Sequence, residues 1–99
     1  MTASPSRVVT LADVVDAARR DFAPGELAGV LALLATYGVE QHERDPERVR
    51  LGILAIVRGD RAALEKWVGW AKQDWRDVLF AVQQTYGASW ENVFIEGHR

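Results

Sequence analysis

The sequence predicts an all-α protein, a compact bundle of about four helices with a docked C-terminal tail. Apolar residues recur at helical spacing, helix-start and helix-stop residues bound these stretches, and 48% of the 99 residues are hydrophobic against 26% charged, as in a globular domain. We expect one domain over residues 1–99, because a chain of this length supports one core. The helices are expected at about 11–22, 24–37, 46–58 and 61–86.

The first two helices are bounded by recognisable caps. Thr10 is a candidate N-cap, with Asp13 placed to interact with the helix start. Pro24 suits the first turn of the second helix because its missing N–H is not needed there, and Gly38 supplies a left-handed stop. Residues 1–9 have no periodicity, so we expect a flexible lead-in.

The third helix has the clearest start in the chain. Asp45-Pro46-Glu47 combines an N-cap, a proline at the first helical position and an acid in the first turn. The helix is apolar on most sides, so we expect other helices to enclose it. It ends at Gly59, and Asp60 caps the next helix.

The fourth helix is predicted as one continuous element over residues 61–86. A single broad apolar face carries Leu64, Trp67, Val68, Ala71, Trp75, Val78, Leu79, Val82 and Tyr86. Gly87 ends it. The tail, residues 88–99, contains Trp90 and Phe94 and is too apolar to be free, so we expect it to dock on the bundle.

Composition excludes several classes of function. The net charge of −2, with basic residues spread along the chain, argues against a nucleic-acid partner. No apolar run approaches the roughly 18 residues of a membrane span, so we expect no membrane partner. The chain has no cysteine and no signal-peptide pattern, which excludes disulfides and favours the cytoplasm.

Neither histidine belongs to a metal or catalytic pattern. His42 lies near Glu40 and Glu43 in a loop, and His98 is close to the C-terminus. Metal sites on helices place three or four ligands on converging faces, and the sequence has no such spacing. We therefore predict no metal site, no cofactor and no catalytic residue, which disfavours an enzyme.

Asp74 and Asp77 lie three residues apart on the predicted fourth helix, where like charges repel. Arg48 and Arg50 are candidates to compensate them. One interpretation is a structural network that ties the third helix to the fourth. The other is a carboxylate pair for acid–base work or for a cation.

Trp70 and Phe80 lie roughly 130° and 150° from the centre of the main apolar face. Two large aromatic side chains in this position need cover. Another helix of the same bundle or the C-terminal tail could supply it. Alternatively, Trp70 and Phe80 form a surface for self-association or for a protein partner, because aromatic residues are common interface anchors.

The stretch from Tyr37 to Phe80 resembles a pattern of short bacterial helical proteins with no assigned function. Its marks are Glu43-Arg44-Asp45-Pro46-Glu47-Arg48-Val49-Arg50-Leu51, Ile53-Leu54, Gly59-Asp60 and Asp74-Trp75-Arg76-Asp77-Val78-Leu79. The pattern often has tyrosine where this chain has Trp75. The resemblance implies a helical fold and no particular activity. The polar positions that it marks are Arg48, Arg50, Asp74, Arg76 and Asp77.

Two functions follow from these observations. The first is a small non-catalytic helical protein–protein interaction module, which could pair with itself as a homodimer through Trp70 and Phe80. The alternative is a binder of small anions, or an enzyme, that uses the Arg/Asp cluster, because arginine suits carboxylate and phosphate groups.

Overall fold

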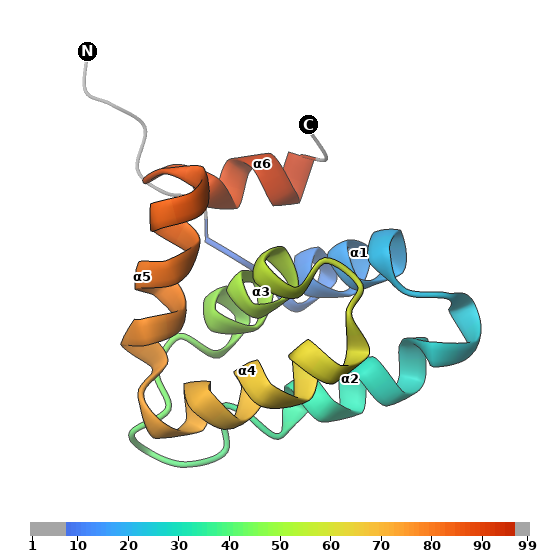
Figure 1. Ribbon diagram of the computed structural model, residues 1–99, viewed down its shortest axis with the longest axis horizontal. Helices are drawn as coiled ribbons and strands as arrows, with labels where there is room; N and C mark the ends of the chain where they lie inside the picture. The colour runs from blue at the N-terminus through green and yellow to red at the C-terminus, as the bar shows by residue number, and fades with distance from the viewer. Residues whose placement is uncertain (1–7, 97–99) are drawn as a thin grey trace.

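The computed structural model describes residues 8–96, and within them the chain forms six α-helices, one short 3-10 helix and no strand (Figure 1). The elements are α1 (Leu11–Asp21), η1 (Pro24–Glu26), α2 (Leu27–Ala35), α3 (Pro46–Val57), α4 (Arg61–Gln73), α5 (Trp75–Tyr86) and α6 (Trp90–Glu96). The prediction of a compact all-α protein is confirmed. Among these residues no helix combines the length and the apolar character that crossing a membrane requires.

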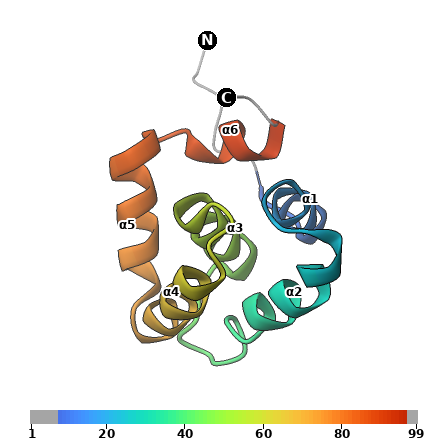
Figure 2. The ribbon, with the colours of Figure 1, turned by 45° about the vertical axis from the view of Figure 1, so that its right-hand side comes forward.

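Helix α3 is the centre of the fold. It contacts α1, α4, α5 and α6, and Figure 2 shows these helices arranged around it. Its buried residues are Val49, Leu51, Gly52, Ile53, Leu54, Ala55 and Val57. Helix α2 packs instead against α1 and α4. The expectation that other helices enclose the third helix is confirmed, because burial on most of its sides matches its apolar sequence.

Several predicted caps are present. The Thr10 hydroxyl accepts a hydrogen bond from the Asp13 backbone N–H, and the Asp13 carboxylate accepts one from the Thr10 N–H. The Asp60 carboxylate accepts from the Ala63 N–H at the start of α4. Gly38 and Gly59 have φ angles of 101° and 88°, which glycine adopts at low cost.

Asp45 precedes α3 as predicted, but its side chain makes no capping hydrogen bond. Its backbone is left-handed, with φ 49° and ψ 53°, which is uncommon for a residue other than glycine. The predicted position of the helix start is therefore right, and the predicted capping interaction is wrong.

The second predicted helix, 24–37, is shorter and divided. Its first turn, Pro24–Glu26, is a 3-10 helix, and α2 ends at Ala35. Tyr37 lies beyond the helix and is fully buried. Side chains of α3 and α4 bind the carbonyls at this end: Arg50 donates to those of Leu34 and Tyr37, and Lys72 donates to that of Thr36.

The largest correction concerns the predicted continuous helix 61–86, which is two helices. Asp74 has an extended backbone, φ −155° and ψ 100°, so it ends α4 and caps α5. Its carboxylate accepts a hydrogen bond of 3.1 Å from the Arg76 N–H. Helix α5 then turns sharply away from α4 (Figure 1).

The geometry of the core explains this break. A continuous helix of these residues would be about 39 Å long, whereas the 12 residues of α3 make a helix of about 18 Å. Two shorter helices can both pack on α3, and both do. The apolar face predicted along 61–86 is therefore kept, but it is folded around the central helix.

The predicted docking of the tail is confirmed within the described residues. Trp90 is fully buried in α6, and Phe94 is largely buried. The Arg20 guanidinium on α1 donates a hydrogen bond to the Phe94 carbonyl. At the other end of the chain, the flexible lead-in is wrong at Val9, which belongs to the core. Residues 1–7 and 97–99, including His98, lie outside the described residues.

Candidate functional site

The structure does not bring the five predicted polar residues together. The Arg48 Nε donates a 2.5 Å hydrogen bond to Oε2 of Glu91 on α6. The Arg48 guanidinium also lies 5.9 Å from the centre of the Trp90 ring. The Glu91 side chain is only 1% exposed, so Arg48 neutralises a buried carboxylate. Arg48 therefore attaches α6 to α3.

Arg50 closes the C-terminal end of α2. Its Nε donates to the Leu34 carbonyl at 3.0 Å, and Nη2 donates to the Tyr37 carbonyl at 2.5 Å. Its third partner is the Glu47 carboxylate, 3.0 Å from Nη1. The last carbonyls of a helix lack partners within the helix. Arg50 satisfies those near the end of α2, which is a structural role.

Asp74 and Arg76 pair with each other at the surface. The Arg76 Nε and Nη2 donate to the two Asp74 carboxylate oxygens at 3.0 and 3.2 Å. The hydrogen bond from the Arg76 side chain, followed by the one from its backbone, lowers the pKa of Asp74. Asp77 is exposed at the third position of α5. Asp74 and Asp77 thus have the spacing of an N-cap and an acid in the first turn.

Neither Arg48 nor Arg50 forms an ion pair with Asp74 or Asp77 among the described residues. The predicted compensation between the helices is wrong, because Arg48 pairs with Glu91, Arg50 with Glu47 and Asp74 with Arg76. Asp74 followed by Asp77 is a helix-start pattern in the sequence. The continuous apolar face over 61–86 favours a single helix instead.

A double-mutant cycle should show this distribution of partners. Arg48→Met and Glu91→Gln are expected to couple by at least about 1 kcal/mol in the free energy of unfolding, because either change leaves a charge without its partner. Arg48→Met and Asp74→Asn are expected not to couple. Urea unfolding of the single and double variants measures both. If Arg48 coupled with Asp74 and not with Glu91, the pairing of Arg48 with Glu91 would be contradicted.

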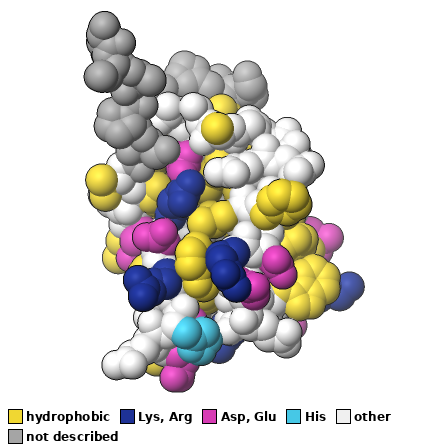
Figure 3. Space-filling model, turned by 90° about the vertical axis from the view of Figure 1, so that its left-hand side faces the viewer, with side chains coloured by type: hydrophobic (Ala, Val, Ile, Leu, Met, Phe, Trp, Pro, Cys, Tyr) yellow, Lys and Arg dark blue, Asp and Glu magenta, His cyan; other side chains and the backbone are white. Residues whose placement is uncertain are grey.

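Trp70 on α4 and Phe80 on α5 remain exposed, at 49% and 64% of their surface. Neither the described part of the tail nor another helix covers them. The Trp70 ring meets the Trp67 ring edge-on, with centroids 4.9 Å apart. Figure 3 shows the side of the molecule formed by α5, where hydrophobic side chains lie among side chains of both charges.

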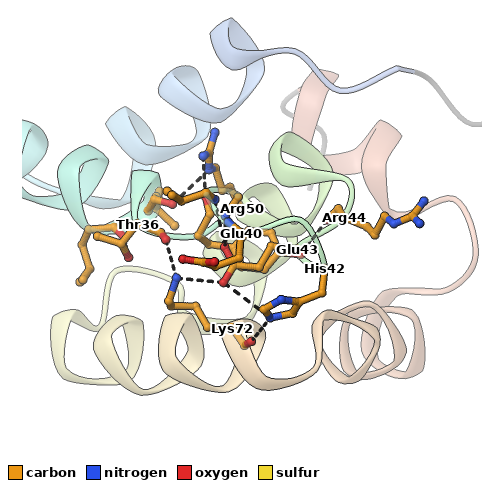
Figure 4. Close-up of polar contacts among 12 residues, drawn as sticks. Thr36, Glu40, His42, Glu43, Arg44, Arg50 and Lys72 are labelled. Atoms are coloured by element: carbon orange, nitrogen blue, oxygen red, sulfur yellow. Dashed lines mark hydrogen bonds and ion pairs between the residues drawn. The ribbon is translucent and has the colours of Figure 1, made fainter.

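The residue that sequence reasoning missed is Glu43, in the loop between α2 and α3. Its side chain is 1% exposed. Oε1 accepts hydrogen bonds from the backbone N–H groups of residues 38, 39 and 40, at 2.7, 3.0 and 3.2 Å. Oε2 lies 2.9 Å from the Lys72 Nζ on α4 (Figure 4). Glu43 thus ties its own loop to α4.

These contacts decide the chemistry of Glu43. Burial raises the pKa of its carboxyl group, but the hydrogen bonds from Lys72, Gly38, Glu40 and Val39 outweigh burial and lower the pKa to about 2. A general base acts best with a pKa near the working pH. Glu43 is therefore a structural carboxylate and a poor candidate for catalysis.

Further hydrogen bonds join the remainder of this loop to Tyr37 and to α4. The Tyr37 hydroxyl donates to the Arg44 carbonyl at 2.6 Å. Burial and the negative charges of Glu43 and Asp45 raise the pKa of Tyr37, so its hydroxyl stays protonated. His42 is exposed, and its Nε2 lies 3.0 Å from the Lys72 carbonyl. Arg44 points away from this network (Figure 4).

The anchored loop forms one wall of an open groove of about 530 Å³. His42, Arg44 and Asp45 line it on the loop side, and residues 73–76 at the joint between α4 and α5 line it on the other. Asp74 and Arg76 are thus the two predicted polar residues that reach the groove. No sequence pattern predicts the groove, because the residues of its two walls are about 30 positions apart in the chain.

The described residues contain no group of three or more His, Asp or Glu side chains that could hold a metal ion. No family model matches the chain, no curated protein is detectably similar to it, and no solved structure matches its fold. The resemblance to short bacterial helical proteins therefore stays a hypothesis. The function has to be argued from the surface of this molecule.

Proposed function

We propose that this chain is a small non-catalytic interaction module that pairs with a second copy of itself. The observation that carries the proposal is the exposure of Trp70 and Phe80, at 49% and 64%, on consecutive helices. Exposed aromatic side chains of this size are frequent anchors of protein interfaces. Trp70 is also held against Trp67, which limits the freedom it loses on binding.

Trp70 and Phe80 lie on helical strips of α4 and α5 that approach each other at the groove. We define the outer face as the exposed residues Lys66, Trp70 and Gln73 on α4 and Arg76, Asp77, Phe80 and Gln84 on α5. Gln73 lies one helical turn from Trp70, and Arg76 one turn from Phe80. Both Gln73 and Arg76 line the groove, so the two helical strips meet there.

The charges of the outer face favour a second copy as the partner. Together with Asp74 at the groove, the face carries two acidic and two basic side chains, Asp74, Asp77, Lys66 and Arg76. A two-fold dimer places the same patch on both sides of the interface. A balanced patch can pair acid with base across the two-fold axis, whereas a patch of one sign would repel its copy.

Self-association is tested by sedimentation velocity from about 5 to about 500 μM protein, because an interface limited to two helices falls at the small end of the stable range. We expect the weight-average mass to rise from 11.0 kDa towards twice that value. Trp70→Ala and Phe80→Ala should each weaken association at least about tenfold, the loss of about 1.4 kcal/mol expected for an interface anchor.

Leu11→Ala is the matched control, because Leu11 is also an exposed apolar side chain, at 59%, but lies on α1. It should associate as the wild type does. A wild-type protein that stays monomeric throughout the range would refute the proposal. So would equal association of all three variants.

A further inference from the structure

We propose that the groove between the α2–α3 loop and the joint of α4 with α5 binds a small molecule that has a planar ring and one anionic group, a carboxylate or a phosphate. The inference rests on the groove itself and not on the proposed dimer. Its volume of about 530 Å³ lies within the range of small-molecule sites. The groups that line it determine the class of ligand.

Arg44 is the first element of the site. Its guanidinium forms no hydrogen bond or ion pair with any described residue, although the residue is fixed at both sides. Its carbonyl accepts from Tyr37, and the preceding Glu43 is buried and fully tied to the loop and Lys72. A backbone held by these hydrogen bonds thus presents five guanidinium donors that have no partner among the described residues, the arrangement that recognises carboxylate and phosphate oxygens.

Arg76 supplies the second cationic group from the opposite wall. Asp74 occupies its Nε and one hydrogen of Nη2 and so fixes the plane of the guanidinium. Nη1 has no partner among the described residues. The side of the guanidinium that carries Nη1 and the second hydrogen of Nη2 therefore remains available for another acceptor. The pair with Asp74 orients the arginine without using all its donors.

Trp75 and the nearby acids restrict the ligand. Trp75 is half-buried and lines the groove, so it offers an aromatic surface on which a planar ring can stack. The carboxylates of Asp45 and Asp74 also line the groove. They would repel a ligand with several negative charges, which favours a single anionic group. Asp45 lies in a left-handed backbone conformation, a strain often found at binding sites.

The test is a titration of ¹⁵N-labelled protein with phenyl phosphate and, separately, with benzoate, which distinguishes the two kinds of anionic group. We expect at least one to shift the amides of residues 42–45 and 73–76 saturably, with a Kd of about 1 mM because the arginines are exposed. Methyl phosphate, which lacks the ring, and benzamide, which lacks the charge, should each bind at least about fivefold more weakly.

Arg44→Gln should weaken the better ligand at least about fivefold, because it removes the unpaired charge. Arg19→Gln, at an exposed arginine on α1, is the matched control and should leave the Kd unchanged. The Phe80→Ala variant should bind as the wild type does at a concentration at which both are monomeric, which separates this site from the proposed dimer, because Gln73 and Arg76 belong to the outer face as well as to the groove. The inference is overturned if neither ring ligand shifts the groove amides, or if the Arg44 and Arg19 variants bind equally.

Discussion

Replacing Glu43 by glutamine is expected to lower the free energy of unfolding by about 3 kcal/mol at pH 7. The carboxylate accepts three backbone hydrogen bonds and a bond from Lys72 in a buried position. Its pKa falls from 4.5 to about 2 on folding, and each unit corresponds to about 1.4 kcal/mol. A domain of this size has about 5–15 kcal/mol in total, so this is a large loss.

The effect should depend on pH with a defined sign. The folded-state pKa lies below the unfolded value, so the folded protein binds fewer protons between pH 4.5 and about 2. The stability that Glu43 supplies is therefore complete above pH 4.5 and is lost as the pH falls through this window. The difference between the wild type and Glu43→Gln should shrink accordingly.

Urea unfolding at several pH values measures both effects. Glu40→Gln is the matched control, since Glu40 lies in the same loop but is exposed. It should change stability by no more than about 0.5 kcal/mol. A wild type and a Glu43→Gln variant with the same stability at pH 7 would show that Glu43 does not anchor the loop.

Trp90→Ala is expected to cost about 3–5 kcal/mol, the usual loss when a buried tryptophan is truncated. Trp90 is fully buried at the start of α6. The Trp90 ring lies against the central helix at Gly52, where a Cβ atom would be 3.5 Å from it, an ordinary contact distance. Arg48 covers the ring at 5.9 Å. The substitution removes the main contact between α6 and the core.

Trp70→Ala provides the comparison within the same chain. Trp70 is half exposed and touches Trp67, so its truncation should cost about 1 kcal/mol or less. Thermal and urea unfolding of both variants, at a concentration below dimer formation, measure the difference. If Trp90→Ala were no more damaging than Trp70→Ala, the docking of α6 would be contradicted.

Helix caps and periodicity were readable from the sequence because both are local. The Thr10 and Asp60 caps and the glycine at position 38 act on residues within a few positions of themselves. The enclosure of α3 was also predictable, since a helix that is apolar on most sides must be covered. The same local reasoning failed at Asp74. Its cap competes with a continuous apolar face, and in the folded protein the helix breaks at the cap.

The candidate site was less predictable than the fold. Two of the residues predicted from the sequence, Asp74 and Arg76, do line the groove. The prediction also included Arg48 and Arg50, which instead bind Glu91 on α6 and the Leu34 carbonyl of α2. Glu43 lies in a polar loop, and nothing in the local pattern there indicates that its side chain is buried. Its partners Gly38 and Lys72 act from different parts of the chain, and no spacing rule relates a loop carboxylate to a lysine 29 residues later.

The sequence by itself thus determined the helical class, most helix boundaries and the enclosed third helix, and it placed Trp70 and Phe80 away from the main apolar face. These follow from periodicity and from caps, which depend on neighbouring residues. Only the tertiary structure decided where the fourth predicted helix breaks, which acid each arginine neutralises, and that a buried Glu43 holds the loop that forms the groove. Those features depend on distances between remote segments, and such distances exist only once the core has packed.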